Sequence, residues 1–137
     1  QWTIWYQLID PAMHEQDGSN AIDGLNGISI IDDYENKSEL FYQIGIEYLF
    51  IENYTKSNYY FKKSLNYDYL DHSALYNILY CYEMNRDNKG LIVFLKEYLS
   101  KNPYSEIGWH NLGKSYVKVK MYNEAIAAFD YSIFSVS

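Results

Sequence analysis

The side chains that could bind a metal or carry out catalysis are few and widely spaced in this sequence. His14 stands alone near the N-terminus, and His72 and His110 are 38 residues apart, whereas zinc ligands usually come in closely spaced pairs. The single cysteine, Cys81, lies between two tyrosines and has no adjacent Lys or Arg that would favour a reactive thiolate. We therefore predict that these residues are structural, and that the chain has no metal site and no cofactor.

Carboxylates near the N-terminus are the other side chains whose type would suit catalysis or metal binding. Asp32 and Asp33 are adjacent and Glu15 precedes Asp17 closely, but both groups lie in polar, Gly-containing sequence, where nothing would raise the pKa of a general acid. The run that starts at Asp17 also lacks the alternating ligands and the final Glu of a calcium loop. We interpret these carboxylates as solvated loop charges and predict that the chain is not an enzyme.

The composition narrows the class of protein. The chain has 137 residues, of which 48% are hydrophobic, with only 2 Pro and 7 Gly, so it can bury a core and is not of the disordered type. Its net charge of −7 has the wrong sign for binding nucleic acid, and no apolar run approaches the roughly 18 residues needed to span a bilayer. One cysteine makes no internal disulfide. We expect a cytoplasmic protein that binds neither nucleic acid nor membranes.

A 34-residue repeat organises most of the chain. Tyr48, Tyr82 and Tyr116 recur at this interval, and so do the runs Asn77-Ile-Leu and Asn111-Leu-Gly. The predicted units are 38–71, 72–105 and 106–137.

Each unit contains two stripes of helical periodicity. In the first unit, one stripe comprises Phe41, Ile44, Gly45 and Tyr48, and the other comprises Tyr54, Ser57, Phe61, Ser64 and Leu65. Small residues at the eighth and twentieth positions of a unit, here Gly45 and Ser57, let two helices approach closely. We therefore predict an all-α fold of antiparallel helix pairs.

The third unit carries the most specific signature. It reads Trp109-x2-Leu112-Gly113-x2-Tyr116, continues with Ala125 and Phe129, and is preceded by Pro103. This pattern resembles the tetratricopeptide repeat (TPR), and the stretch 102–113 is similar to uncharacterised bacterial proteins with many such repeats. The resemblance implies a right-handed α-solenoid that acts as a protein-interaction scaffold. The middle unit departs from the pattern, because Leu79 and Leu91 replace the usual small residues.

Residues 1–37 allow two readings. With Ala21 at position twenty, Trp5 and Leu8 fall at positions four and seven, which suggests a degenerate fourth repeat. Pro11 removes a backbone donor within the first proposed helix, and two glycines weaken the second by roughly 1 kcal/mol each. An irregular N-terminal cap is therefore the alternative.

The resemblance also implies where a partner would bind, because the first helices of stacked repeats line a concave groove. The candidate peptide-binding residues are Tyr42, Tyr76, Asn77, Tyr80, Asn111 and Lys114. Tyr supplies contact area at small entropic cost, and an Asn amide can donate to and accept from a peptide backbone. A carboxylate clamp is not expected, because Tyr42 and Ile46 occupy positions where such a clamp needs Lys and Asn. The alternative is that the tyrosines only pack against neighbouring helices.

The last unit ends without a following helix that would cap it. Its second helix has an apolar face formed by Ala125, Ile126, Phe129, Ile133 and Phe134. Exposed faces of this kind commonly mark contacts, so self-association through this helix, or a role as a spacer within a longer array, is the alternative function. A third hypothesis is that the repeats serve as an adaptor for an enzyme activity elsewhere in a longer parent chain.

Overall fold

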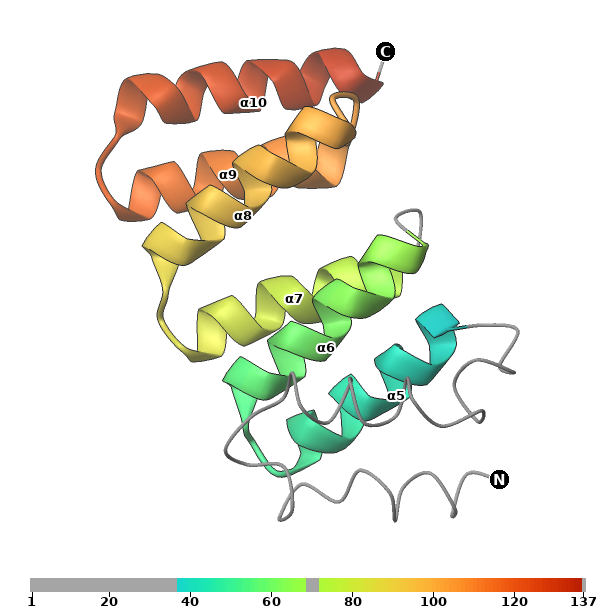
Figure 1. Ribbon diagram of the computed structural model, residues 1–137. Helices are drawn as coiled ribbons and strands as arrows, with labels where there is room; N and C mark the ends of the chain where they lie inside the picture. The colour runs from blue at the N-terminus through green and yellow to red at the C-terminus, as the bar shows by residue number, and fades with distance from the viewer. Residues whose placement is uncertain (1–36, 69–71, 137) are drawn as a thin grey trace. The chain divides into compact units, whose positions relative to one another are not determined.

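The computed structural model describes residues 37–68 and 72–136, and these form helices and turns, with no strand among them (Figure 1). The helices are α5 (Lys37–Phe50), α6 (Tyr54–Tyr67), α7 (His72–Met84), α8 (Asn88–Lys101), α9 (Glu106–Lys118) and α10 (Tyr122–Val136). The predicted all-α class is confirmed. The two readings of 1–37 concern residues outside the described part, apart from Lys37, which begins α5.

The chain divides into two compact units between Cys81 and Tyr82, within α7. In the first unit, α5 and α6 form an antiparallel pair. The Ser38 hydroxyl lies 3.0 Å from that of Ser64, and the Ser57 hydroxyl donates to the Gly45 carbonyl at 2.8 Å. Residue numbers therefore rise along one helix as they fall along the other.

In the second unit, α9 and α10 form the corresponding pair. The rings of Trp109 and Tyr131 stack with their centroids 4.6 Å apart, and Gly113 lies opposite Phe129. A Cβ built on Gly113 would lie 2.6 Å from the Phe129 ring, and one on Gly45 would lie 2.8 Å from the Phe61 ring. The glycine at the eighth position therefore lets an aromatic ring pack directly on the helix backbone.

The same turn joins the two helices of each pair. Glu52, Arg86 and Lys120 lie 34 residues apart, and all three have left-handed backbones, with φ of 59°, 53° and 64°. After Glu52, the Asn53 amide donates to the Tyr48 carbonyl at 3.0 Å, and equivalent bonds follow Arg86 and Lys120. This is the Schellman ending, which usually employs glycine at the left-handed residue. The 34-residue period thus recurs in the backbone, while the boundaries of the three repeats, 38–71, 72–105 and 106–137, stay a prediction.

Side-chain oxygens cap the N-termini of three of the described helices. The Asn53 Oδ1 accepts from the Lys56 amide at 3.2 Å, the Asp87 Oδ1 from Gly90 at 2.9 Å, and the Ser105 Oγ from Gly108 at 3.0 Å. Each bond satisfies an amide that has no partner within its helix. Among the helices described, none combines the length and the apolar character that a membrane crossing requires.

Candidate functional site

The six residues predicted to bind a peptide lie on the first helices of the pairs. Tyr42 is on α5, Tyr76, Asn77 and Tyr80 are on α7, and Asn111 and Lys114 are on α9. The four residues on α5 and α7 belong to the first of the two compact units, and the two residues on α9 belong to the second compact unit. Their role in binding stays a prediction.

Asn77 joins α7 to α5. Its Nδ2 donates to the Tyr42 hydroxyl at 3.1 Å and to the Ser73 carbonyl at 3.0 Å, while the Tyr42 ring packs against Phe61. Both N–H groups of the amide are thereby used within the fold. What Asn77 can offer to a ligand is its Oδ1 acceptor, which is less than the sequence pattern indicated.

Tyr76 and Tyr80 lie one turn apart on α7, with 55% and 43% of their surfaces exposed. The Tyr80 ring meets the Tyr54 ring edge-on, with centroids 6.1 Å apart. Burial, followed by the carboxylate of Glu52 and by Tyr80, raises the pKa of Tyr54, so its hydroxyl stays protonated at neutral pH. The Tyr80 ring is thus held against Tyr54, and Tyr76 and Tyr80 together present an exposed aromatic surface with polar tips.

Asn111 and Lys114 are neighbours on one face of α9. The Asn111 Nδ2 donates to the Ile107 carbonyl at 2.8 Å, one turn earlier, as Asn77 does on α7. The amide is half-buried and the Lys114 side chain is exposed. This pair could supply one amide N–H, one carbonyl oxygen and a positive charge to a bound segment.

The residues with catalytic or metal-binding chemistry are separated in the described structure. Cys81 is fully buried, and burial raises the pKa of its thiol, although a hydrogen bond with Ser57 lowers it in part. In residues 37–68 and 72–136, no group of three or more His, Cys, Asp or Glu side chains is placed to hold a metal ion. His14 and the carboxylates at 15–33 lie outside these residues. The thiol is therefore a neutral packing group.

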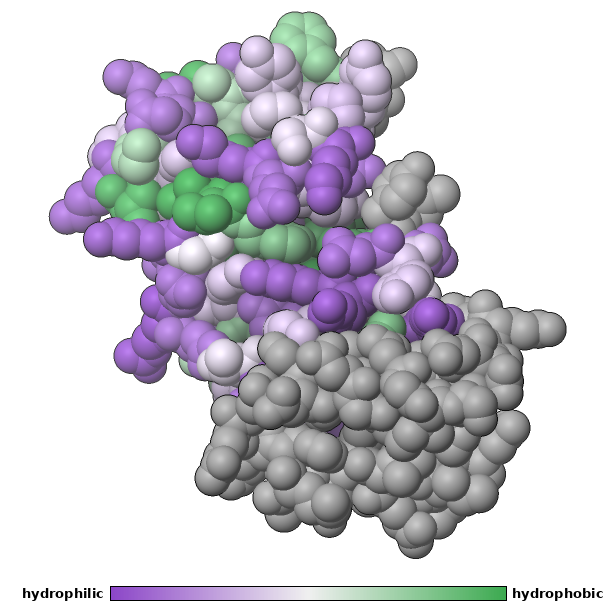
Figure 2. Space-filling model, in the orientation of Figure 1, coloured by the Kyte–Doolittle hydropathy of each residue, from purple (hydrophilic) through white to green (hydrophobic). Residues whose placement is uncertain are grey.

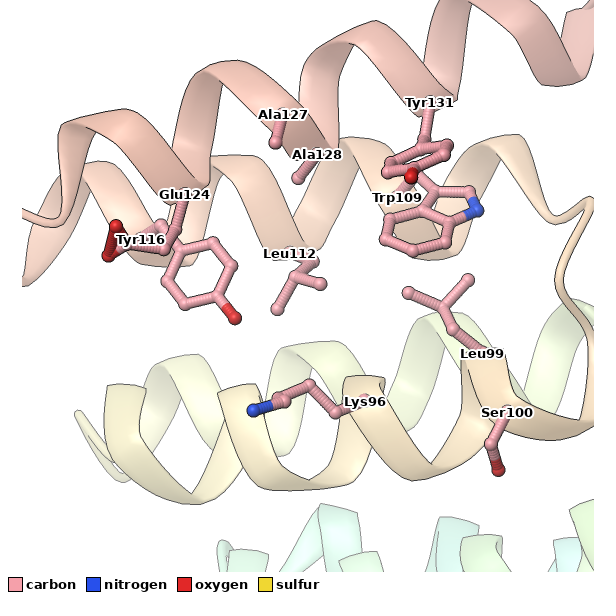
Figure 3. A pocket seen from close by; sticks show the side chains of 10 residues that line it. All are labelled: Lys96, Leu99, Ser100, Trp109, Leu112, Tyr116, Glu124, Ala127, Ala128 and Tyr131. Carbon is pink, nitrogen blue, oxygen red and sulfur yellow. The ribbon is translucent and has the colours of Figure 1, made fainter.

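A cleft that the sequence reasoning missed lies between α8, α9 and α10 (Figure 3). Its volume is about 400 Å³, and its lining residues are Lys96, Leu99, Ser100, Trp109, Leu112, Tyr116, Glu124, Ala127, Ala128 and Tyr131. The Trp109 and Tyr131 rings stack at one end, and the Trp109 Nε1 donates to the Pro103 carbonyl at 2.7 Å. The Tyr116 hydroxyl and the Lys96 ammonium lie at the other end. The cleft therefore has an aromatic end and a polar end.

Hydrophobic side chains also reach the surface elsewhere. On the face seen in Figure 2 they gather at the level of α8 and α9, between hydrophilic neighbours. Along α10, Ile126, Ile133 and Phe134 are exposed over 60%, 66% and 74% of their surfaces. Ile126 and Ile133 occupy the same repeat positions as Asn58 and Leu65 of α6, and those two residues are buried. The face of α10 is thus open where that of α6 is covered.

Comparison with known proteins bears on the fold. Neither a protein-family model nor a curated protein matches this sequence. Among solved structures, the chain is similar to that of MamA, a TPR-type protein, with 20% identity over 88% of this chain and 70% of that one and a TM-score of 0.57. At this identity the likeness concerns the fold alone. The chain therefore has an all-α helical repeat fold similar to that of MamA.

Proposed function

We propose that this chain is a non-enzymatic interaction module that holds an extended or helical segment of a partner protein against its first helices. The leading contacts are Tyr42, Tyr76, Asn77, Tyr80, Asn111 and Lys114. A helical repeat fold similar to that of MamA supports a role as a protein-interaction scaffold. The buried free thiol of Cys81 suits the cytoplasm that we propose as its compartment.

The observation that carries the proposal is the exposure of Tyr76 and Tyr80. Two large aromatic side chains, one turn apart, lie about half in solvent beside an amide whose orientation is fixed by hydrogen bonds to Tyr42 and to the backbone. Met84 continues this row by one further turn and is 44% exposed. Tyr is enriched among the residues that dominate protein interfaces, because it buries a large area for few rotatable bonds.

Binding of displayed peptides tests the proposal. Peptides selected from a random display library on the full chain would be titrated against the wild type and against Tyr76→Ala and Tyr80→Ala by calorimetry. We expect each variant to weaken binding about tenfold or more, as loss of a central interface aromatic does. Tyr104→Ala is the matched control, because Tyr104 is 84% exposed in the turn between α8 and α9. Unchanged affinity in the two α7 variants, with folding intact by circular dichroism, would overturn the proposal.

The exposed α10 face supports a second function, namely self-association or spacing within a larger assembly. Ile126 and Ile133 share one side of α10 with Tyr122, so together they form a continuous apolar stripe. Light scattering across a range of protein concentrations would detect a dimer, and Phe134→Asp should dissociate it. A chain that stays monomeric at millimolar concentration would count against this function and leave the peptide-binding proposal intact.

A further inference from the structure

The second helices of the three pairs, α6, α8 and α10, differ in charge. α6 carries three Lys and no carboxylate, and α8 carries three Lys and one Glu. α10 carries two carboxylates, Glu124 and Asp130, and no Lys or Arg. Asp130 occupies the repeat position of Lys62 on α6 and of Lys96 on α8. The charge is therefore reversed on the last helix, at a position where the other two have a Lys.

Asp130 lies within the exposed apolar face of α10. Ile126, Asp130 and Phe134 follow one another at intervals of four residues, so they form one ridge along the helix. All three side chains are exposed, and so is that of Ile133 beside them. Glu124 lies on another side of α10, where it lines the cleft between α8, α9 and α10. The face thus combines large apolar side chains with one carboxylate.

The matching face of α8 shows what kind of element covers such a surface. Leu99 of α8 occupies the repeat position of Ile133, but Leu99 is buried. Ile92 matches Ile126 and is half-buried. The cover is α9, because a Cβ built on Gly108 would lie 2.7 Å from the Leu99 side chain. A helix with a small residue at the point of contact therefore fits a face of this type.

A second copy of the chain matches the α10 face poorly. In a symmetric pair of α10 helices in which Ile126 of one copy meets Phe134 of the other, the midpoint of the contact falls on Asp130. Two carboxylates would then face each other, and like charges that share a partly buried contact repel. A helix with Lys or Arg opposite Asp130 would pair with this carboxylate instead.

We propose that the α10 face binds an amphipathic helix of a partner protein, with apolar residues against Ile126, Ile133 and Phe134 and a Lys or Arg that pairs with Asp130. The bound helix covers α10 as α9 covers α8. This inference rests on the second function proposed above, in which α10 makes contacts within a larger assembly, and it names the chemistry of the partner. It uses no residue of the peptide-binding surface on α5, α7 and α9.

Two peptides of opposite charge test the occupant. One is a synthetic helical peptide of the length of α10, made of Leu, Ala and Lys with Leu at helical periodicity, and its twin has Glu at every Lys. We expect the full chain to bind the Lys peptide at least tenfold more tightly than the Glu peptide in calorimetry. With ¹³C-labelled isoleucine methyl groups, the signals of Ile126 and Ile133 should move. Those of Ile44 and Ile78, buried in the first compact unit, should not.

A matched pair of charge changes separates this site from general attraction to an acidic chain. Asp130→Lys restores the residue type of α6 and α8, and we expect it to weaken the Lys peptide at least tenfold and to favour the Glu peptide. Glu124→Lys makes the same change in net charge on another side of α10 and should alter binding by less than about twofold. Both side chains are exposed, so circular dichroism should show intact folding. Equal losses in the two variants would overturn the proposal.

Other results would also contradict the assignment. Equal affinity for the two peptides, or no binding of either, would remove Asp130 from recognition. A dimer of the chain alone that Phe134→Asp dissociates in light scattering would assign the face to a second copy and leave the second function standing. Loss of binding in Tyr76→Ala, with the Ile126 methyl unmoved by the peptide, would place the peptide on the α7 surface. A monomeric chain that binds the Lys peptide is the result we predict.

Discussion

The first helix pair, α5 and α6, and the last, α9 and α10, have the same backbone design and differ in how they are filled. Both place a glycine against an aromatic ring, and both turn through a left-handed residue with the same hydrogen bonds. In the first pair, the Tyr60 ring stacks on Tyr48, whereas the last pair has Ala128 at the position that matches Tyr60 and Tyr116 at the position that matches Tyr48.

The ends of the two pairs differ as well. The Ser64 hydroxyl donates to the Ser38 carbonyl at 2.7 Å, and the Ser38 hydroxyl donates to the Ser64 carbonyl at 2.9 Å. The equivalent bond of the last pair, from Ser132 to the Glu106 carbonyl, is 3.5 Å long. Buried, short hydrogen bonds contribute more than long ones, so the first pair is the more tightly joined.

The largest expected difference between the pairs in free energy of unfolding comes from removing the aromatic ring that packs on the glycine. Phe61 is fully buried and Phe129 is half-buried. We expect Phe61→Ala to lower the free energy of unfolding by about 3–5 kcal/mol, because it leaves a cavity between α5 and α6, and Phe129→Ala to cost about half as much. Urea unfolding followed by circular dichroism would measure both. Val93→Ala, at a position 67% exposed, serves as the control, and a larger loss from Phe129→Ala would reverse the comparison.

A smaller difference in the free energy of unfolding should come from removing the hydroxyls of Ser64 and Ser132. Ser64→Ala removes a buried hydroxyl that joins α5 to α6, and we expect a loss of about 1–2 kcal/mol in unfolding free energy. Ser132→Ala removes only the long bond to Glu106, so its loss should be within about 0.5 kcal/mol. Thermal unfolding of the two variants sharpens the comparison. Equal losses would mean that the two pairs are joined equally well.

An effect of opposite sign, smaller than those of Phe61 and Ser64, is expected in the turns. Glu52, Arg86 and Lys120 hold the left-handed conformation in which glycine carries no steric penalty. Replacing any one of them by Gly should therefore raise the free energy of unfolding by about 0.5–1 kcal/mol, despite the greater freedom of glycine in the unfolded chain. The corresponding Ala variants should show no gain. A gain from Ala as large as that from Gly would mean that backbone strain is not the cause.

The fold was predictable because its determinants are local and repeat. Small residues at the eighth and twentieth positions, such as Gly45 and Ser57, predict close helix pairs from spacing alone, and α8 ends at Lys101, just before Pro103. These features depend on residue type at fixed intervals.

The details of the candidate sites were less predictable because they depend on which groups meet across helices. The Asn77 amide donates hydrogen bonds to the Tyr42 hydroxyl and the Ser73 carbonyl, and the sequence spacing does not predict these bonds. The cleft between α8, α9 and α10 left no signal of this kind, because its lining comes from three helices whose side-chain packing the repeat spacing does not specify.

A chemical-shift map of the ¹⁵N-labelled chain with a selected peptide tests the central claim most directly, namely that the exposed tyrosines of α7 receive a partner. We predict that the largest amide shifts fall on α5 and α7 around Tyr42, Tyr76 and Tyr80, and that Asn111 and Lys114 on α9 also respond. Shifts confined to α10, with α7 unmoved, would contradict it.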